Sequence, residues 1–141
     1  MLKRGNLIAA FTMVMFMTVP LIFIFLEEDY ITSPYVDDDK ATFSGNIVQE
    51  GDSRIHSMRI YDNVTRIHCV LTCGGADFDL YGRFGERPSI DEYDFIGYSS
   101  EGENVYYDYP ESGILHLMVR SYSGIGHYNL LVELEYSETE E

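Results

Sequence analysis

One stretch decides the fold of this chain: Gly75-Ala76-Asp77-Phe78-Asp79-Leu80-Tyr81-Gly82-Arg83-Phe84. It opens with a glycine turn and continues as a strand with a period of two. Phe78, Leu80 and Gly82 face one side of that strand, whereas Asp79, Tyr81 and Arg83 face the other. The segments before this stretch read as strands that lead into it, and the segments after it read as strands that return from it.

The same two-residue period continues on both sides of this stretch. Turn sequences such as Glu50-Gly51-Asp52 separate the alternating segments roughly every ten residues. The pattern predicts eight strands, at residues 42–49, 54–61, 64–72, 78–84, 92–98, 104–109, 114–122 and 128–134. No segment after residue 42 has helical periodicity. We therefore expect one all-β domain over residues 42–135, an antiparallel β-sandwich of jelly-roll or Greek-key type.

Residues 7–26 form an uncharged, apolar run before the strands. A helix of this length spans about 30 Å, the thickness of a hydrocarbon core. Lys3 and Arg4 precede the run and acidic residues follow it, so the positive-inside rule places residues 1–6 in the cytoplasm. We expect one N-terminal transmembrane α-helix that acts as an uncleaved signal anchor. The protein would then be a single-pass cell-membrane protein whose C-terminal domain is extracytoplasmic.

Two alternatives for this N-terminus stay open. A cleaved secretory signal has a shorter apolar region and a site of small residues, which the stretch 23–28 does not offer. Lys3-Arg4-Gly5 directly before an apolar helix resembles the processing site of archaeal pilins and archaellins, which would be cut after Gly5. That resemblance covers only the N-terminus.

Acidic segments flank the predicted sandwich. Residues 27–41 are predicted to be a stalk, because Ser33-Pro34 breaks any helix and Asp37-Asp38-Asp39 is too charged to pack. Residues 136–141 are predicted to be an acidic tail. The whole chain has 9 basic and 24 acidic residues, a net charge of -15. A surface of this sign repels nucleic acid, so we expect no nucleic-acid partner.

Residues 42–135 resemble the bacterial pre-peptidase C-terminal domain, whose relatives include the collagen-binding modules of clostridial collagenases. The matching motifs, in chain order, are Phe43-Ser44-Gly45, residues 67–75, the Asp-x-Asp-Leu-Tyr motif at residues 77–81, residues 113–119 and Tyr122-Ser123-Gly124. The resemblance implies a non-catalytic β-sandwich that is attached to secreted proteins, where it assists secretion, surface retention or substrate binding.

Asp77 and Asp79 are the candidate metal ligands. They lie two residues apart in an extended segment, so both carboxylates would point to one side, where calcium could bind them together with loop carbonyls. Capping of the backbone N–H groups of the glycine turn is the alternative, and it is the interpretation that we favour. The collagen-binding relatives bind calcium largely through acidic residues near the start of the module. That likeness adds Asp37-Asp38-Asp39 as a second candidate region.

The cysteines and histidines do not predict a catalytic or zinc site. Cys69 and Cys73 lie about 13 Å apart in a continuous strand, too far for a disulfide, and we favour two buried free thiols. A disulfide stays open if the strand ends early. His56 is expected to face the core and His68 the solvent. The side chains of His68 and its neighbour Cys69 therefore point to opposite faces of the strand, and they cannot converge on a zinc ion or form a nucleophilic pair. We expect no enzyme activity and no cofactor other than calcium.

Tyrosines crowd the second half of the domain and predict a partner surface. Strand parity places Val105 and Tyr107 inward and leaves Tyr106 on the outer face, where it could bind a polymer or a neighbouring subunit. Half-buried tyrosine is also common in sheets, so a purely structural role is the alternative. Asn63-Val64-Thr65 is a glycosylation sequon on an expected turn.

Together these observations predict a membrane-anchored extracytoplasmic module that binds a protein or polymer partner at the cell surface and does not catalyse. The alternative is a subunit of an extracellular filament or envelope assembly. In that case the apolar N-terminal helix would pack into the polymer, and the sandwich would decorate its exterior.

Overall fold

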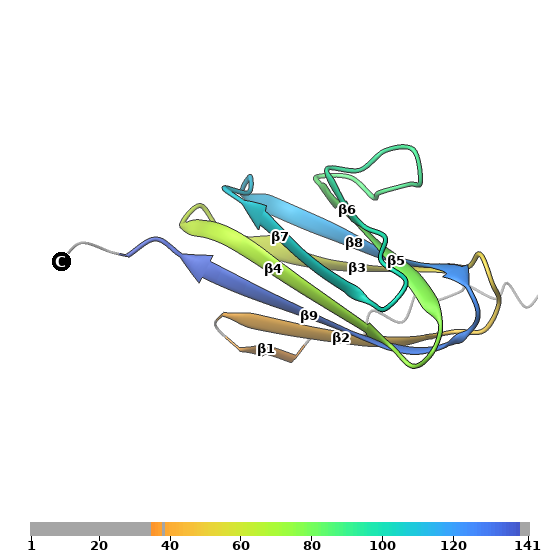
Figure 1. Cartoon of the computed structure of the whole chain (residues 1–141). Coiled ribbons are helices and arrows are strands. Elements are labelled where there is room, and N and C mark those ends of the chain that lie inside the picture. The colour runs from red at the N-terminus through yellow and green to blue at the C-terminus, as the bar shows by residue number, and fades with distance from the viewer. Residues whose placement is uncertain (1–34, 38, 139–141) are drawn as a thin grey trace, which may run out of the picture.

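A computed structural model describes residues 35–37 and 39–138 of the chain as a two-layered β-sandwich (Figure 1). Its nine strands are β1 (Tyr35–Asp37), β2 (Lys40–Ile47), β3 (Ser53–Ile60), β4 (Val64–Cys73), β5 (Asp77–Phe84), β6 (Phe95–Gly97), β7 (Glu103–Asp108), β8 (Gly113–Ser123) and β9 (Gly126–Tyr136). One sheet has the order β1-β2-β9-β4-β7, and the other has the order β3-β8-β5-β6. The described residues contain no helix.

The strands pair as a nested series. β2 pairs with β9, β3 with β8, β4 with β7, and β5 with β6, all antiparallel. Within the series, β4 also pairs with β9 and β5 with β8, which completes the two sheets. This is the jelly-roll arrangement, so the predicted fold class of the domain is confirmed.

Each of the eight predicted strands is present, and the differences lie at their ends. The predicted strand at 92–98 is reduced to the three residues of β6. At the N-terminal end, β1 and the first residues of β2 lie in the segment predicted to be a stalk, and Ala41 is fully buried. At the C-terminal end, Tyr136 belongs to β9 and packs against the core. The strands therefore extend beyond residues 42 and 135 at both ends.

Several predictions concern residues outside the described part of the chain. The cytoplasmic N-terminus, the transmembrane anchor at 7–26, the first part of the stalk, Asp38 and the end of the acidic tail are among them. Among the residues that the structure does describe, there is no helix of the length and apolar character that a membrane span requires.

Alternate residues of the strands fill the space between the two sheets, as the period of two predicts. Ile67, Cys69 and Leu71 of β4 are buried, and Leu115, Leu117 and Val119 of β8 are fully buried opposite them. Cys73 is only partly buried, and both cysteines are free thiols because β4 stays extended through Cys73. The preferred interpretation, two buried free thiols, is therefore confirmed for Cys69, whereas Cys73 is free but only partly buried.

The outer face of β5 is less exposed than its alternation predicts. Asp79 and Tyr81 lie on the face opposite to Phe78 and Leu80, yet they are only 7% and 6% exposed. Tyr93, in the loop between β5 and β6, packs edge-on against the Tyr81 ring. The Tyr81 hydroxyl donates a hydrogen bond of 3.4 Å to Asp79. The loop residue thus covers part of the outer face, which strand parity alone does not predict.

Candidate binding groove

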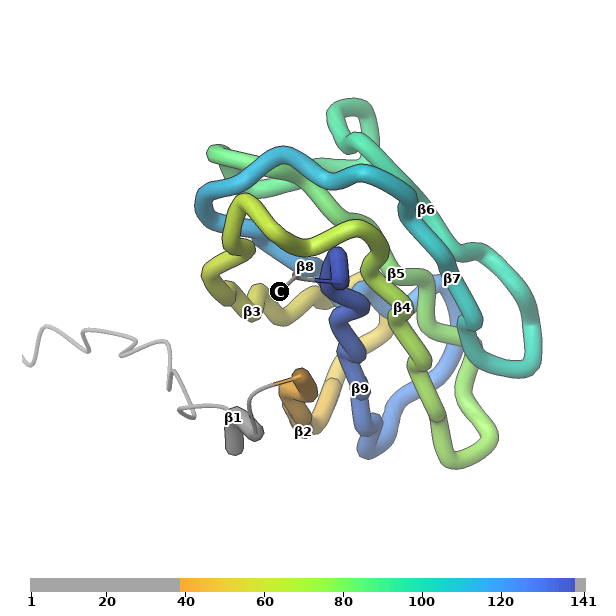
Figure 2. The backbone as a smooth tube through the Cα atoms, turned by 90° about the vertical axis from the view of Figure 1, so that its left-hand side faces the viewer, coloured from red at the N-terminus to blue at the C-terminus, as the bar shows by residue number. Residues whose placement is uncertain are grey.

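β6 and β7 are the last strands of their respective sheets, and they lie side by side along one edge of the sandwich (Figure 2). Gly97 makes their close approach possible. A methyl group at this position would lie 2.8 Å from Val105 Cγ2 and would also contact the Glu103 carboxylate. The absence of a side chain at Gly97 therefore allows the two strands to approach each other closely along this edge.

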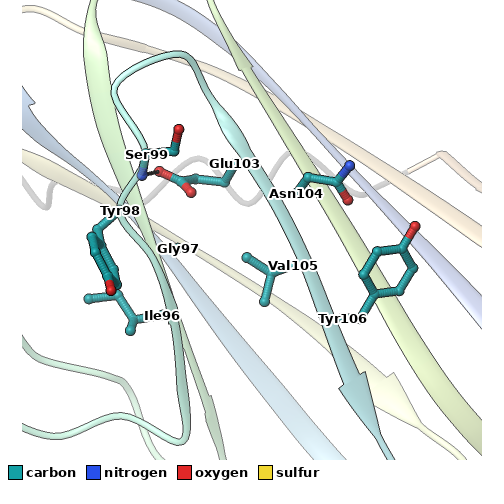
Figure 3. A pocket seen from close by; sticks show the side chains of 8 residues that line it. All are labelled: Ile96, Gly97, Tyr98, Ser99, Glu103, Asn104, Val105 and Tyr106. Carbon is teal, nitrogen blue, oxygen red and sulfur yellow. Dashed lines mark hydrogen bonds between the residues drawn. The ribbon is translucent and has the colours of Figure 1, made fainter.

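A groove of about 360 Å³ runs along this edge. It is lined by residues of β6, β7 and the loop that joins them: Ile96, Gly97, Tyr98, Ser99, Glu103, Asn104, Val105 and Tyr106. Figure 3 shows Tyr98 and Ile96 on the β6 side, Tyr106 and Asn104 on the β7 side, and Val105 between them. The side chains of Tyr98 and Tyr106 are 77% and 57% exposed. The groove therefore has exposed aromatic groups on both sides, which is typical of binding surfaces.

Glu103 places a carboxylate at one end of the groove. Its side chain is only 4% exposed, and it accepts a hydrogen bond of 2.7 Å from the Ser99 backbone N–H (Figure 3). Burial raises the pKa of Glu103 above its usual value, and the negative charges of Asp79 and Asp77 raise it further. The Ser99 N–H opposes these effects. A cation brought to this end of the groove would relieve the repulsion.

The ring of Tyr106 is held in place by its neighbours on the outer face of the sheet. It stacks on the His68 ring, with the centroids 4.1 Å apart and the planes 2° from parallel. Arg66 Cζ lies 5.9 Å from the Tyr106 centroid. The predicted outward orientation of Tyr106 and of His68 is confirmed, and Val105 and Tyr107 pack inward as expected. A fixed aromatic side chain loses little entropy when it binds a partner.

His68 links this tyrosine to a polar network on the same face. His68 Nε2 lies 2.7 Å from Asn104 Oδ1, and its Nδ1 lies 3.0 Å from Glu133 Oε2. Glu133 also pairs with Lys40 at 2.9 Å. Lys40 and His68 together lower the pKa of the Glu133 carboxyl. This network supports the wall of the groove that Asn104 and Tyr106 form.

Asp77 and Asp79 lie at the start of β5, where the ladder with β8 is irregular between Asp77 and Phe78. Burial raises the pKa of Asp79, and the charge of Asp77 raises it further, so the two carboxylates are close enough to repel each other. The hydrogen bond found for Asp79 comes from the Tyr81 hydroxyl, not from the glycine turn that the capping interpretation requires. Within residues 35–37 and 39–138, no three His, Cys, Asp or Glu side chains are arranged to hold a metal ion. Calcium at Asp77 and Asp79 stays a prediction.

His56 faces inward, as predicted, but it contributes to the core and not to the groove. Its Nε2 lies 2.7 Å from the Tyr128 hydroxyl, and its ring stacks on Phe43. Burial lowers the pKa of His56 to about 4 and raises that of Tyr128 to about 12. Asn63 lies exposed in the turn between β3 and β4, and its glycosylation stays a prediction.

One pair of side chains resembles part of a nucleophilic site. Ser57 Oγ lies 2.7 Å from His116 Nδ1 on the outer face of the β3-β8-β5-β6 sheet. In a catalytic triad, a carboxylate would orient the histidine and favour its protonated form. His116 instead has its pKa lowered, by burial and by the positive charge of Arg87. The pair therefore lacks the electrostatic support that an activated serine requires.

Sequence reasoning identified Tyr106 but missed the groove itself. The sequence patterns single out neither Gly97 nor Glu103, and Tyr98 is only one of the tyrosines that crowd the second half of the domain. That cluster was the available signal. The approach of β6 to β7 could not be inferred, because these strands belong to different sheets.

Comparisons with known proteins bear on the fold. No protein-family model matches the chain. No curated protein matches it significantly in sequence. The structure is similar to that of PliG from Aeromonas hydrophila, a periplasmic lysozyme inhibitor of g-type lysozyme, with a TM-score of 0.54 and 13% identity over 69% of this chain and 87% of that one. It is also similar to the pre-peptidase C-terminal domain of a collagenase from Bacillus anthracis, with a TM-score of 0.53 and 17% identity over 65% of this chain and 87% of that one. The resemblance inferred from the sequence motifs is thus supported at the level of the fold.

Proposed function

We propose that this protein is a membrane-anchored extracytoplasmic module that binds a protein partner through the groove between β6 and β7 and does not catalyse a reaction. The observation that carries the proposal is the pair of exposed tyrosines, Tyr98 and Tyr106, on the two sides of a groove of about 360 Å³. Tyrosine is enriched in protein interfaces because it offers apolar area together with a polar hydroxyl.

Two further observations support an extracytoplasmic binding role. The apolar run at residues 7–26, with basic residues before it and acidic residues after it, favours a signal anchor. The similar structures are a periplasmic inhibitor of g-type lysozyme and the pre-peptidase C-terminal domain of a collagenase, and the first of these acts outside the cytoplasm.

A crosslinking experiment in intact cells tests the proposal. A photoreactive phenylalanine derivative replaces Tyr98 in the full chain, and the same derivative replaces Tyr61 as a control. Tyr61 is 59% exposed but lies in the turn after β3, away from the groove. We expect a discrete crosslinked protein from position 98 and none from position 61. Equal crosslinking at the two positions, or none at either, would refute binding through the groove.

The location of the domain is tested in the same cells. A protease added outside intact cells should degrade the β-sandwich while a cytoplasmic protein stays intact, and mass spectrometry of the N-terminus should find residues 1–6 still attached. Protection of the sandwich from the protease would refute the extracytoplasmic location. An N-terminus that begins after Gly5 would refute the uncleaved anchor and favour a processed, pilin-like subunit.

A further inference from the structure

His68 lies between two side chains that approach both nitrogens of its ring. Its Nδ1 lies 3.0 Å from Glu133 Oε2, and its Nε2 lies 2.7 Å from Asn104 Oδ1, within the side-chain amide of Asn104. Both distances are those of hydrogen bonds. Stacking on Tyr106 holds the plane of the imidazole ring. Because Asn104 and Tyr106 line the groove, this histidine stands directly behind one of its walls.

The contact with Glu133 determines where the ring carries its first proton. An ionised carboxylate can only accept hydrogen bonds, so Nδ1 must carry a hydrogen atom toward Glu133. Glu133 also pairs with Lys40 at 2.9 Å, and Lys40 and His68 together hold the pKa of its carboxyl below the usual value. Glu133 therefore stays ionised near neutral pH, and Nδ1 is protonated in the neutral as well as in the charged ring.

The contact with Asn104 depends on the charge of the ring. In the neutral imidazole with a hydrogen on Nδ1, Nε2 has a lone pair and can only accept a hydrogen bond. In the imidazolium, Nε2 carries a hydrogen and donates. The Asn104 side chain can bind either form, because its amide has an NH2 donor on one side and a carbonyl acceptor on the other. A half-turn of the amide exchanges the two.

The other charged groups around His68 on this face of the sheet form ion pairs. The pairs are Arg66 with Asp108, Arg66 with Glu135, and Lys40 with Glu133. Arg66 also lies over the Tyr106 ring, on which the imidazole stacks. Glu133 is the carboxylate in direct contact with the imidazole, at 3.0 Å. Carboxylates, lysine and arginine keep their charges between about pH 5 and 8, whereas histidine is the side chain that changes its charge in this range.

We infer that protonation of His68 turns the side-chain amide of Asn104 and thereby changes which hydrogen-bonding group the groove wall offers to a partner. With the ring neutral, the Asn104 NH2 group donates to Nε2, and its carbonyl oxygen is left to accept from a partner N–H or O–H. With the ring charged, Nε2 donates to the carbonyl oxygen, and the NH2 group is left to donate to a partner carbonyl or carboxylate. This inference rests on the proposed function for the role of the groove, and it specifies how binding there is regulated.

NMR spectroscopy of the 15N-labelled full chain in detergent tests the amide turn without any partner. A hydrogen bond from the Asn104 NH2 group to His68 Nε2 transmits a scalar coupling between the two nitrogens, whereas a bond from Nε2 to the carbonyl oxygen does not. We expect the coupling at about pH 8 and its loss at about pH 5, where the imidazole is charged. A coupling at both pH values, or at neither, would overturn the inference.

A matched pair of variants separates this effect from a general response to pH. His68→Phe keeps a ring that can stack on Tyr106 but has no nitrogen to bind Asn104. His127→Phe removes another histidine, which is exposed on β9. We expect the pH-dependent shift of the Asn104 NH2 signal to be at least about fivefold smaller in His68→Phe than in the natural protein and in His127→Phe. Equal shifts in all three proteins would overturn the inference.

Crosslinking from position 98 in intact cells tests the consequence for the partner. The yield should differ at least about threefold between an external pH of about 5.5 and one of about 8, and His68→Phe should remove this difference. An equal response to pH with and without His68 would overturn the regulation by His68, although the crosslink itself would leave the proposed function standing. If no protein is crosslinked at either pH, the proposed function is refuted, while the NMR result still decides the amide turn.

Discussion

His56 Nε2 and the Tyr128 hydroxyl lie 2.7 Å apart between the two sheets, where they form a hydrogen bond. The fit is close, because the Tyr128 hydroxyl occupies the space beside Gly45 where a side chain would otherwise stand. Tyr128 is 1% exposed, and burial of His56 disfavours its charged form. This pair therefore makes the core sensitive to acid.

Acid should therefore destabilise the sandwich through His56. Its pKa is about 4 in the folded protein and about 6.5 when unfolded, so the unfolded chain binds more protons between these values. The contribution is fully present above about pH 6.5 and is lost as the pH falls toward 4. It amounts to about 1–3 kcal/mol in the free energy of unfolding. Urea unfolding at several pH values should show this slope in the natural protein, and His56→Phe should flatten it. An unchanged slope in His56→Phe would contradict the assignment.

Removing the acidic repulsion near the groove should stabilise the protein at neutral pH. Asp79→Asn eliminates a carboxylate whose pKa is raised by burial and by Asp77, and it also relieves Glu103. We expect an increase on the order of 0.5 kcal/mol in the free energy of unfolding at pH 7. Because both raised pKa values favour the protonated form on folding, the gain should shrink as the pH falls. Asp52→Asn, at a carboxyl outside this cluster, is the control and should leave stability nearly unchanged.

The predicted calcium site leads to a separate prediction about thermal stability. Calcium bound between Asp77 and Asp79 would neutralise their repulsion, so millimolar calcium chloride should raise the melting temperature by several degrees through binding to the folded state alone. Asp79→Asn should abolish the increase. Sodium chloride at equal ionic strength controls for general screening. If calcium and sodium give the same melting curve, calcium does not bind at this pair.

Gly82 should tolerate no side chain. A methyl group there would overlap the ring of Phe95, which packs onto β5 from β6. Gly82→Ala should lower the free energy of unfolding by about 1–3 kcal/mol and disturb β6, the shorter wall of the groove. Gly74→Ala is a matched control, since no atom lies within 4 Å of the added methyl group, and it should change stability by less than about 0.5 kcal/mol. Chemical denaturation of the two variants measures the difference.

The period of two accounts for what the sequence could predict. Residues such as Ile67, Leu117 and Val119 alternate with polar neighbours, and that alternation alone places strands and core-facing side chains. β1 escaped prediction because Tyr35–Asp37 is a short segment between a proline and a run of acids, with no alternation long enough to detect. It pairs with β2 as a tight hairpin in which Asp37 lies opposite Lys40.

The sequence does not predict the groove, for a different reason. The two-residue alternation of β7 predicts that Tyr106 lies on the outer face. Its stacking on His68, however, depends on the register between β4 and β7, and the composition of the connecting loop does not determine that register. In the same way, Tyr81 was expected on an open face, because nothing in the alternation of β5 shows that Tyr93 returns to cover it. Sequence patterns predict which way a side chain points, but not what it meets there.

The pairing of β2 with β9 joins nearly the first and the last residues of the sandwich. No portion of the chain that ends before β9 can complete the five-stranded sheet, so closure must wait until the C-terminal strand has left the ribosome. If the chain is exported while it is being made, the earlier strands would cross the membrane unpaired and assemble only afterwards. Such late closure of distant strands makes folding slow, and it leaves the incomplete sheet open to aggregation until the final strand is inserted.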